Sequence, residues 1–336
     1  MASHLATMKD LIDQARKLEP IRVAVVDATQ GLVIETLREA HELGIVEPYL
    51  IGAPEGIKSV CKDLGWKWDE SWIVPVSTDQ AAAKAVELVR DGESDAVMKG
   101  NIHTDTLMHA LLKKEHGLRL PGQRVSHVFV AEVPAYPKLL GITDAAINIA
   151  PDLNAKTQIL QNAVALFHLL GIEVPKVAVL SAVETVNPAI VSTLDAACLT
   201  LMARRGQIGG GVVDGPLAFD NAISIKAAKE KEIVSEVAGD ADILLVPDLV
   251  SGNILAKNLE YFAGAVAAGV VVGLAVPVAL SSRADPPAAR LAALALASLM
   301  HHQASRAALA KTAVPETSLN CAPQPEHACC PIPGMM

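Results

Sequence analysis

Aromatic residues make up only 3% of this 336-residue chain, and charged residues only 19%. Few rings are therefore available for base stacking. Lysine and arginine total 28 against 37 acidic residues, which gives a formal net charge of −9. A chain of that sign has no overall attraction to nucleic acid or anionic lipid, although a local basic pocket could still hold a small anion. With 51% hydrophobic residues, the chain can bury a large core and is long enough for two domains.

Cysteines are few, and their spacing predicts no disulfide framework. The chain has five, and three of them, Cys321, Cys329 and Cys330, lie near the C-terminus, so the body carries only the isolated thiols of Cys61 and Cys198. The N-terminus lacks the basic and apolar regions of a secretory signal. Together these features predict a cytoplasmic protein.

One uncharged stretch, residues 262–280, is long enough to span a bilayer. It is rich in Ala and Gly, and Gly269, Gly273 and Pro277 interrupt it. The sequence therefore predicts a buried helix end, a turn and a buried strand, and no membrane partner.

Short β-branched runs alternate with helical stretches along most of the chain, which predicts an α/β fold with mostly parallel sheets. Residues 124–132 break this pattern, because their period of two is typical of a half-buried antiparallel strand, and a second such strand is expected over 144–149. Later expected elements include a helix over 224–237, a strand over 275–281 and a last helix over 287–302.

Two α/β/α domains are predicted. The first comprises residues 1–149 together with 285–312, and the second comprises residues 150–284. Residues 313–336 are rich in Pro and Cys and are expected to form a loose tail that binds no metal.

The chain also lacks the common nucleotide and hydrolase signatures. No G-x-x-x-x-G-K-[ST] loop, no G-x-G-x-x-G after a strand and no G-x-S-x-G elbow is present. No H-x-x-x-H spacing indicates zinc. The chemistry must therefore lie in polar stretches that follow predicted strands, where ligands bind in α/β proteins.

Four such stretches stand out. In the first, residues 98–105, a lysine, a glycine and hydroxyl residues open a helix, which suits an anion site but also suits an ordinary capped junction. The second, 213–221, contains Asp214, and the third, 246–253, ends on Asn253, a candidate ligand residue or simply a helix cap. In the fourth, 277–285, an apolar strand ends on Ser282, Arg283 and Asp285. Arg283 there must be solvated, bind an anion or pair with Asp285.

Seven stretches in order resemble the phosphate acetyl/butyryltransferase family: KGNIHTD, SHVFVAEVP, TDAAINIAPDL, KVAVLSAVETVNP, VDGPLAFDNAIS, AGDADILLVPDLVSGNILAKNLEYFAGA and PVALSSRAD. They span roughly residues 20–302, and the match is closer to the phosphate butyryltransferase, broad-range branch. The resemblance implies an isocitrate/isopropylmalate dehydrogenase-like architecture with an active site between two domains. It also implies a homodimer or higher homo-oligomer.

The resemblance further implies reversible transfer of a short acyl group, acetyl or butyryl, between coenzyme A and inorganic phosphate, by direct thiolate attack. Coenzyme A is then a substrate, with no permanently bound cofactor and no metal. The implied catalytic residues are Ser282 and Arg283, with Asp285 as the nearest carboxylate, because Ala289 occupies the place of the aspartate that serves the acetyl branch. His109 stands where many members have a second arginine. The implied substrate-binding residues are Lys99, Gly100, Asn101, His103, Thr104, Ser126, Asp214 and Asn253.

These residue types suit that chemistry. A thiol is mostly protonated at neutral pH, so a base or a positive field must help to form the thiolate. Arg283 could bind phosphate bidentately, and Ser282 could donate to the oxyanion. Two alternatives remain open. One is a non-catalytic acyl-CoA-sensing module, like that fused to malic enzymes, and the other is an oxidoreductase on the related two-domain scaffold.

Overall fold

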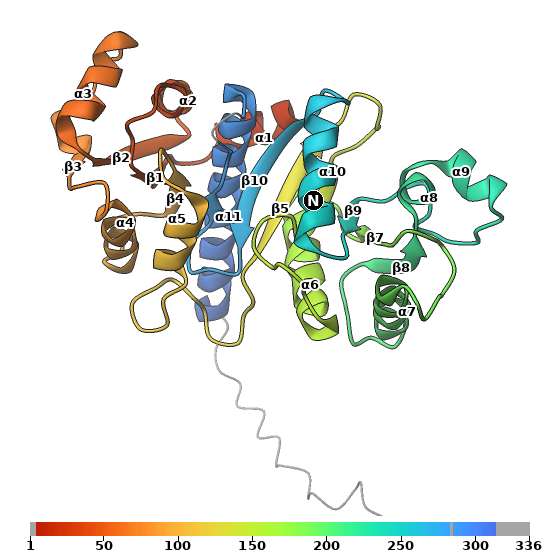
Figure 1. Cartoon of the computed structure of the whole chain (residues 1–336). Helices are drawn as coiled ribbons and strands as arrows, with labels where there is room; N and C mark the ends of the chain where they lie inside the picture. Colours follow the sequence, from red (N-terminus) through yellow and green to blue (C-terminus); the bar gives the residue numbers. More distant parts are fainter. Residues whose placement is uncertain (1–4, 283–284, 314–336) are drawn as a thin grey trace, which may run out of the picture.

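The computed structural model describes residues 5–282 and 285–313, with side chains up to residue 305. Within this part of the chain, one sheet of eleven strands crosses the molecule in the order β3-β2-β1-β4-β11-β10-β5-β6-β9-β7-β8 (Figure 1). The pairs β11–β10, β10–β5 and β5–β6 are antiparallel, and all other neighbouring pairs are parallel. The predicted α/β fold with a mostly parallel sheet is confirmed. The division into two domains stays a prediction, since one sheet runs through both parts.

Helices and strands alternate through the first third of the chain. The elements are α1 (Met8–Ala15), β1 (Ile21–Val26), α2 (Gly31–Glu42), β2 (Val46–Gly52), α3 (Pro54–Asp63), η1 (Glu70–Trp72), β3 (Ile73–Pro75), α4 (Ala81–Arg90), β4 (Ala96–Lys99) and α5 (Thr104–Leu111). The rest of the chain contains β5 (Ser126–Glu132), β6 (Leu140–Thr143), α6 (Leu153–Leu169), β7 (Lys176–Leu180), α7 (Val191–Arg204), β8 (Val212–Leu217), α8 (Phe219–Ile223), α9 (Ile225–Glu230), β9 (Ile243–Leu245), α10 (Leu249–Tyr261), β10 (Val266–Val272), β11 (Val278–Ala279) and α11 (Pro287–Ala313).

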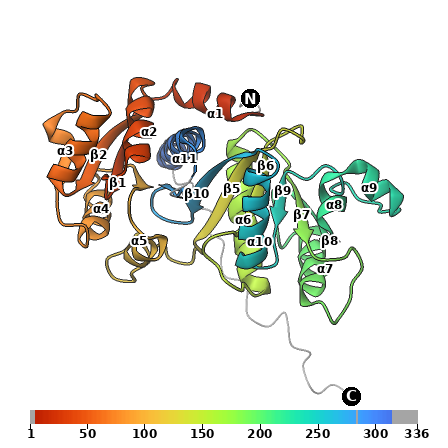
Figure 2. The ribbon, with the colours of Figure 1, turned by 45° about the horizontal axis from the view of Figure 1, so that its top comes forward.

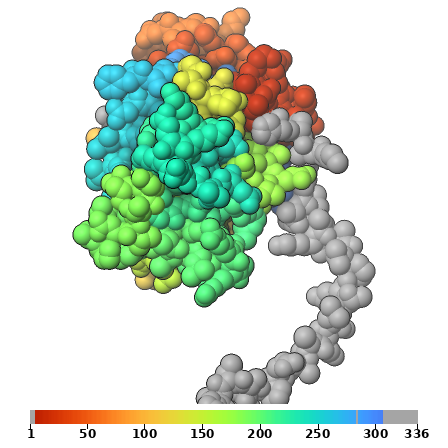
Figure 3. Space-filling model, turned by 90° about the vertical axis from the view of Figure 1, so that its right-hand side faces the viewer, coloured from red at the N-terminus to blue at the C-terminus, as the bar shows by residue number. Residues whose placement is uncertain are grey.

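The sheet is covered on both faces. Buried side chains of α1, α2, α6 and α11 form one core with one face of the strands. On the opposite face, α4 and α5 cover the strands at one end, and α8 and α10 cover those further along. Figure 2 looks nearly down the axis of α11, which lies in the middle of the molecule beside β10. At the far end of the sheet, α7, α8 and α9 form the outer surface (green and teal in Figure 3).

The prediction of a half-buried antiparallel strand was correct in direction and wrong in burial. β5 runs antiparallel to both β10 and β6, but its residues from Ser126 to Ala131 are all buried. The physical reason is that helices cover both faces of the sheet at this point. Ser126 faces α6, since its hydroxyl accepts a hydrogen bond from Asn162 Nδ2 at 2.8 Å.

Three other expected elements differ from the structure. The strand expected over 144–149 is a turn, because the carboxylate of Asp144 accepts the backbone N–H groups of Ala146 and Ile147 at 2.9 and 3.0 Å. The helix expected over 224–237 ends at Glu230, shortly before Glu232 takes a left-handed φ of 55°. The last helix continues past residue 302 to Ala313.

The uncharged stretch 262–280 contains two strands instead of one. After α10 ends, β10 crosses the centre of the sheet and turns back at Gly273 into the short β11. Gly273 has a φ of +84°, and a Cβ atom there would lie 2.2 Å from the carbonyl oxygen of Arg124. Glycine is therefore required for this turn. Among the described residues, no helix is long and apolar enough to cross a membrane.

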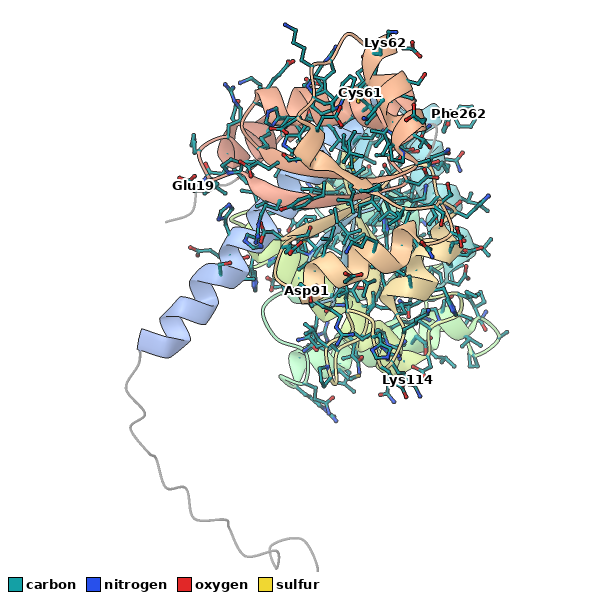
Figure 4. All side chains as sticks on the ribbon, turned by 90° about the vertical axis from the view of Figure 1, so that its left-hand side faces the viewer. Glu19, Cys61, Lys62, Asp91, Lys114 and Phe262 are labelled. Atoms are coloured by element: carbon teal, nitrogen blue, oxygen red, sulfur yellow. The ribbon has the colours of Figure 1, made fainter. Side chains whose placement is uncertain are left out.

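The two cysteines of the body are free thiols. Cys61 on α3, labelled in Figure 4, is buried, whereas Cys198 on α7 is exposed. Burial raises the pKa of the Cys61 thiol to about 11, so this thiol stays protonated at neutral pH. The cysteines of the predicted tail lie outside the described residues, as does the tail from residue 314 on.

Candidate functional site

A cavity of about 700 Å³ lies where β4 and β11 end, with α5 on one side and α10 on the other. Both helices lie in front of the sheet in Figure 1. Five of the predicted site residues line this cavity: Lys99, His103, Thr104, Asn253 and Ser282. They come from three separate stretches of the sequence, 98–105, 246–253 and 277–285, and the parallel arrangement of β1, β4 and β11 brings the carboxyl ends of these strands to one edge of the sheet.

Lys99 is the last residue of β4, and only 4% of its surface is exposed. After it the chain turns into α5, which begins at Thr104 with His103 as the N-cap residue. The His103 side chain does not cap the helix. An ammonium group beside the positive end of a helix dipole makes this end of the cavity suitable for an anion.

Gly100 and Asn101 hold the turn between β4 and α5 in place. Their backbone N–H groups donate to the carbonyl oxygens of Val26 and Asp27 at 3.0 and 2.8 Å. A Cβ atom on Gly100 would lie 2.4 Å from each of those two oxygens, so only glycine lets the turn approach β1 so closely. The two predicted residues therefore shape the site without lining the cavity.

Asp285 does not line the cavity but contacts two residues that do, and it is buried, with 4% exposed. One carboxylate oxygen accepts the backbone N–H of Ser282 at 2.5 Å, and the other lies 3.4 Å from Nζ of Lys257. Lys257 lines the cavity and also pairs with Glu260 at 2.6 Å. Burial alone would lower the pKa of Lys257, but the hydrogen bond to Glu260 and the charge of Asp285 raise it overall. Lys257 therefore places an ammonium group at the cavity wall, with two carboxylates beside it.

Arg290 is the largest fully buried side chain, and it clamps the segment that carries Ser282. Its guanidinium donates to Oγ of Ser281 at 3.2 Å and to the carbonyl oxygens of Ser282 and Asp285 at 2.8 and 3.2 Å. Burial lowers the pKa of Arg290, and the charge of Asp285 opposes that shift. Arg290 was not among the predicted site residues. The sequence signal for it is a single arginine at the start of the very apolar run LAALALASLM.

His127 was also missed. Its ring packs edge-on against Phe129, with the ring centres 4.4 Å apart, and Phe129 lines the cavity. Neither ring nitrogen has a hydrogen-bond partner among the described residues, and the side chain is fully buried. Burial lowers the pKa of His127 to about 4, against the charges of Asp144 and Asp285, so the ring is neutral at physiological pH.

The remaining predicted residues do not come together at the cavity. Ser126 points to the opposite face of the sheet, towards α6. Asp214 lies on β8 at the edge of the sheet, in a separate hollow beside Arg204, whose guanidinium is 3.9 Å away. Arg283 lies outside the described residues, directly after Ser282. Ala289 is buried in α11, and His109 is exposed on α5.

A larger hollow of about 830 Å³ lies on the other side of the first turns of α10, between α6 and α7. It contains the ion pair between Lys156 and Asp195 at 2.6 Å, but none of the predicted site residues. The smaller cavity is the candidate site, because polar side chains that follow several strand ends converge there. In the described part of the chain, no group of three or more His, Cys, Asp and Glu residues is arranged to hold a metal ion.

Comparison with known proteins gives concordant results. Residues 74–297 match the family described as Phosphate acetyl/butaryl transferase. The chain is 49% identical over 290 residues to the phosphate acetyltransferase of Rhizobium meliloti, covering 86% of this chain and 92% of that protein. It is 42% identical over 297 residues to the phosphate butyryltransferase of Clostridium acetobutylicum, covering 88% and 98%. The crystal structure of a branched-chain phosphotransacylase from Enterococcus faecalis superposes with a TM-score of 0.72 at 33% identity, covering 84% of this chain and 99% of that one.

Proposed function

Because the chain belongs to the phosphate acetyl/butyryltransferase family, we propose that it transfers a short acyl group between coenzyme A and inorganic phosphate in the candidate cavity. The observation that carries this proposal is the convergence of Lys99, Lys257, the start of α5 and Ser282 on one cavity. Two ammonium groups and a helix N-terminus suit the phosphate, and a hydroxyl suits a developing oxyanion. Family membership also removes the reason to consider an oxidoreductase.

In the direction of acyl phosphate formation, a phosphate oxygen attacks the thioester carbonyl carbon and forms the new C–O bond. The negative charge passes to the carbonyl oxygen, and its return breaks the C–S bond and releases the thiolate, which takes a proton from water. In the reverse direction, the thiolate attacks the acyl phosphate and releases phosphate. Lys99 and Lys257 hold the phosphate charge, Ser282 donates to the oxyanion, and Arg283 binds the phosphate with two parallel hydrogen bonds.

Asp285 has a different part in this scheme. Its two carboxylate oxygens are occupied by the N–H of Ser282 and the ammonium of Lys257. It therefore holds the backbone of Ser282 in place, and the positive groups around the cavity stabilise the thiolate. No resident cofactor and no metal enter the scheme. Coenzyme A, phosphate and their acyl derivatives are the partners.

The proposal extends to assembly and location. Along α10 and just after it, Val250, Ile254 and Phe262 are 60%, 56% and 88% exposed, and the Phe262 side chain is labelled at the surface in Figure 4. Exposed apolar side chains on one helix support a homodimer or a higher homo-oligomer. The scarcity of cysteine supports a cytoplasmic location.

The test is release of free thiol from acetyl-CoA and butyryl-CoA, with and without phosphate, in the full chain and in three variants. Arg283→Ala and Arg283→Lys should each lose on the order of 10²-fold or more in turnover, because a lysine cannot reproduce two parallel hydrogen bonds. Their melting temperatures should stay close to that of the full chain. Arg205→Ala, which removes an exposed arginine at the end of α7, is the matched control and should retain full activity.

Two results would overturn the proposal. If no acyl-CoA releases thiol in the presence of phosphate, the chain is not an acyltransferase, and the acyl-CoA-sensing module takes its place. If Arg283→Ala and an Asp285→Ala variant lower the melting temperature equally while turnover per folded molecule stays near normal, Arg283 is the structural partner of Asp285 and not a phosphate ligand.

A further inference from the structure

The cavity has a second wall that the phosphate chemistry does not use. Phe129 from β5, Ala145 from the turn after β6 and Leu280 from the end of β11 line it together. All three are buried, at 6%, 0% and 6% exposed. We propose that this apolar wall holds the acyl chain of the substrate, and that Phe129 and Ala145 set the longest chain the enzyme accepts. This inference rests on the proposed function.

The wall begins beside the reacting groups. Leu280 precedes Ser281 and Ser282 directly, so an acyl group whose carbonyl oxygen is bound by Ser282 has apolar surface next to its first methylene groups. Phe129 stands close to Leu280, since both approach Gly269. A Cβ atom on Gly269 would lie 3.2 Å from the Phe129 ring and 2.4 Å from the carbonyl oxygen of Leu280. Phe129 and Leu280 therefore lie side by side, and both are within reach of an acyl chain bound at Ser282.

Ala145 is held rigidly. Nδ2 of Asn253 donates to its carbonyl oxygen at 3.4 Å, and α10 packs so closely that a Cβ atom on Gly252 would lie 3.1 Å from Cα of Ala145. The backbone at Ala145 cannot retreat towards α10, so a larger side chain at this position must take up space in the cavity. The contact between Phe129 and His127 likewise fixes the ring from behind.

Burying one methylene group contributes about 0.8 kcal/mol, which corresponds to a factor of about four in kcat/KM. One methylene more than the pocket can hold causes overlap with the wall, and discrimination of about 10–200-fold per methylene is typical of such pockets. Removing volume from Phe129 should therefore favour longer chains, and adding volume at Ala145 should exclude them.

The experiment measures kcat/KM with phosphate for acetyl-, butyryl- and hexanoyl-CoA. In Phe129→Leu, the ratio of hexanoyl- to butyryl-CoA should rise about fourfold or more. In Ala145→Val, the ratio of butyryl- to acetyl-CoA should fall about tenfold or more while acetyl-CoA is still used. A ratio of two substrates in one preparation does not depend on the fraction of folded protein.

Two matched controls remove or add the same atoms away from the cavity. Phe167→Leu changes a buried phenylalanine of α6, and Ala222→Val changes a buried alanine of α8. Both should lower the melting temperature without changing either ratio. If Phe129→Leu and Ala145→Val also leave the ratios unchanged while the unaltered enzyme is active, the inference is wrong. If the unaltered chain shows no phosphate-dependent thiol release, the proposed function itself fails.

Discussion

The buried imidazole of His127 predicts a marked loss of stability in mild acid. Burial lowers the pKa of this ring to about 4, whereas an unfolded chain has a histidine pKa of about 6.5. Between about pH 6.5 and pH 4, His127 is protonated in the unfolded state but neutral in the folded state. The stabilisation is therefore complete above about pH 6.5 and is lost as the pH falls towards 4.

The magnitude follows from the two pKa values. A full difference of 6.5 − 4 units corresponds to on the order of 3 kcal/mol, and the part lost between pH 7 and pH 5 is about 2 kcal/mol. His301 lies near Asp95, and its pKa is also lowered by burial, so it adds a loss in the same direction. His301 is present both in the unaltered chain and in a His127 variant. The difference between these two proteins therefore isolates the contribution of His127.

Urea unfolding at pH 7, 6 and 5, followed by tryptophan fluorescence and circular dichroism, measures this loss. In His127→Asn, which keeps a small neutral polar group, the decrease between pH 7 and pH 5 should be smaller by about 2 kcal/mol. His127→Gln serves the same purpose if the asparagine variant does not fold. His116→Asn removes an exposed imidazole and should follow the unaltered chain. If both His127 variants lose as much stability on acidification as the unaltered chain does, the imidazole is protonated in the folded state and the reasoning is refuted.

Two further predictions concern the segment around Ser282. Arg290→Met should lower stability by about 3–5 kcal/mol and reduce turnover, because it removes the fully buried charge near Asp285 and the guanidinium donors to Ser281 Oγ and to the carbonyl oxygens of Ser282 and Asp285. Thermal melts and thiol release check both effects, and an unchanged melting temperature would contradict the clamp. Gly269→Ala should lower the free energy of unfolding by about 1–3 kcal/mol, because its Cβ atom would lie 2.4 Å from the carbonyl oxygen of Leu280 and 2.9 Å from Nε2 of His127. The control is Gly31→Ala, at the start of α2, where a Cβ atom meets open space and stability should not change.

Much of the first half of the fold could be predicted from the sequence, because its signals are local. Helix α2 carries Val33, Ile34, Leu37 and Ala40 on its buried face and is followed by Gly44 with a φ of +72°. The helical spacing of these apolar residues and the glycine that follows the helix can both be recognised in the sequence alone. The centre of the sheet was harder to predict, because β10 and β5 are paired although more than 130 residues separate them in the sequence. No local sequence pattern indicates a pairing between such distant strands.

The same difference separates the site residues that were found from those that were missed. Lys99, His103 and Ser282 lie at the ends of strands or within four residues after them, so the rule for parallel sheets places them together. Lys257 was missed although it follows Asn253 by four residues and therefore shares its face of α10. Ser126 and His127 are neighbours on β5 that point to opposite faces. Because both faces of β5 are buried, the alternation of apolar and polar residues along the strand does not indicate which of the two residues faces the cavity.

Under the proposed function, the chain has to work without an aspartate at position 289, and the contacts of Asp285 bear on how it could do so. The buried Ala289 cannot accept a proton, and the carboxylate of Asp285 is occupied by Ser282 N–H and Lys257. The proposed scheme relies instead on Lys99 and the start of α5, and on Lys257, whose charge is shared with Glu260 and Asp285. A positive field lowers the free energy of a thiolate without accepting its proton. Arg290 holds Ser281, Ser282 and Asp285 through its hydrogen bonds, so under the proposed function the Ser282 hydroxyl would meet the developing negative charge with little reorganisation.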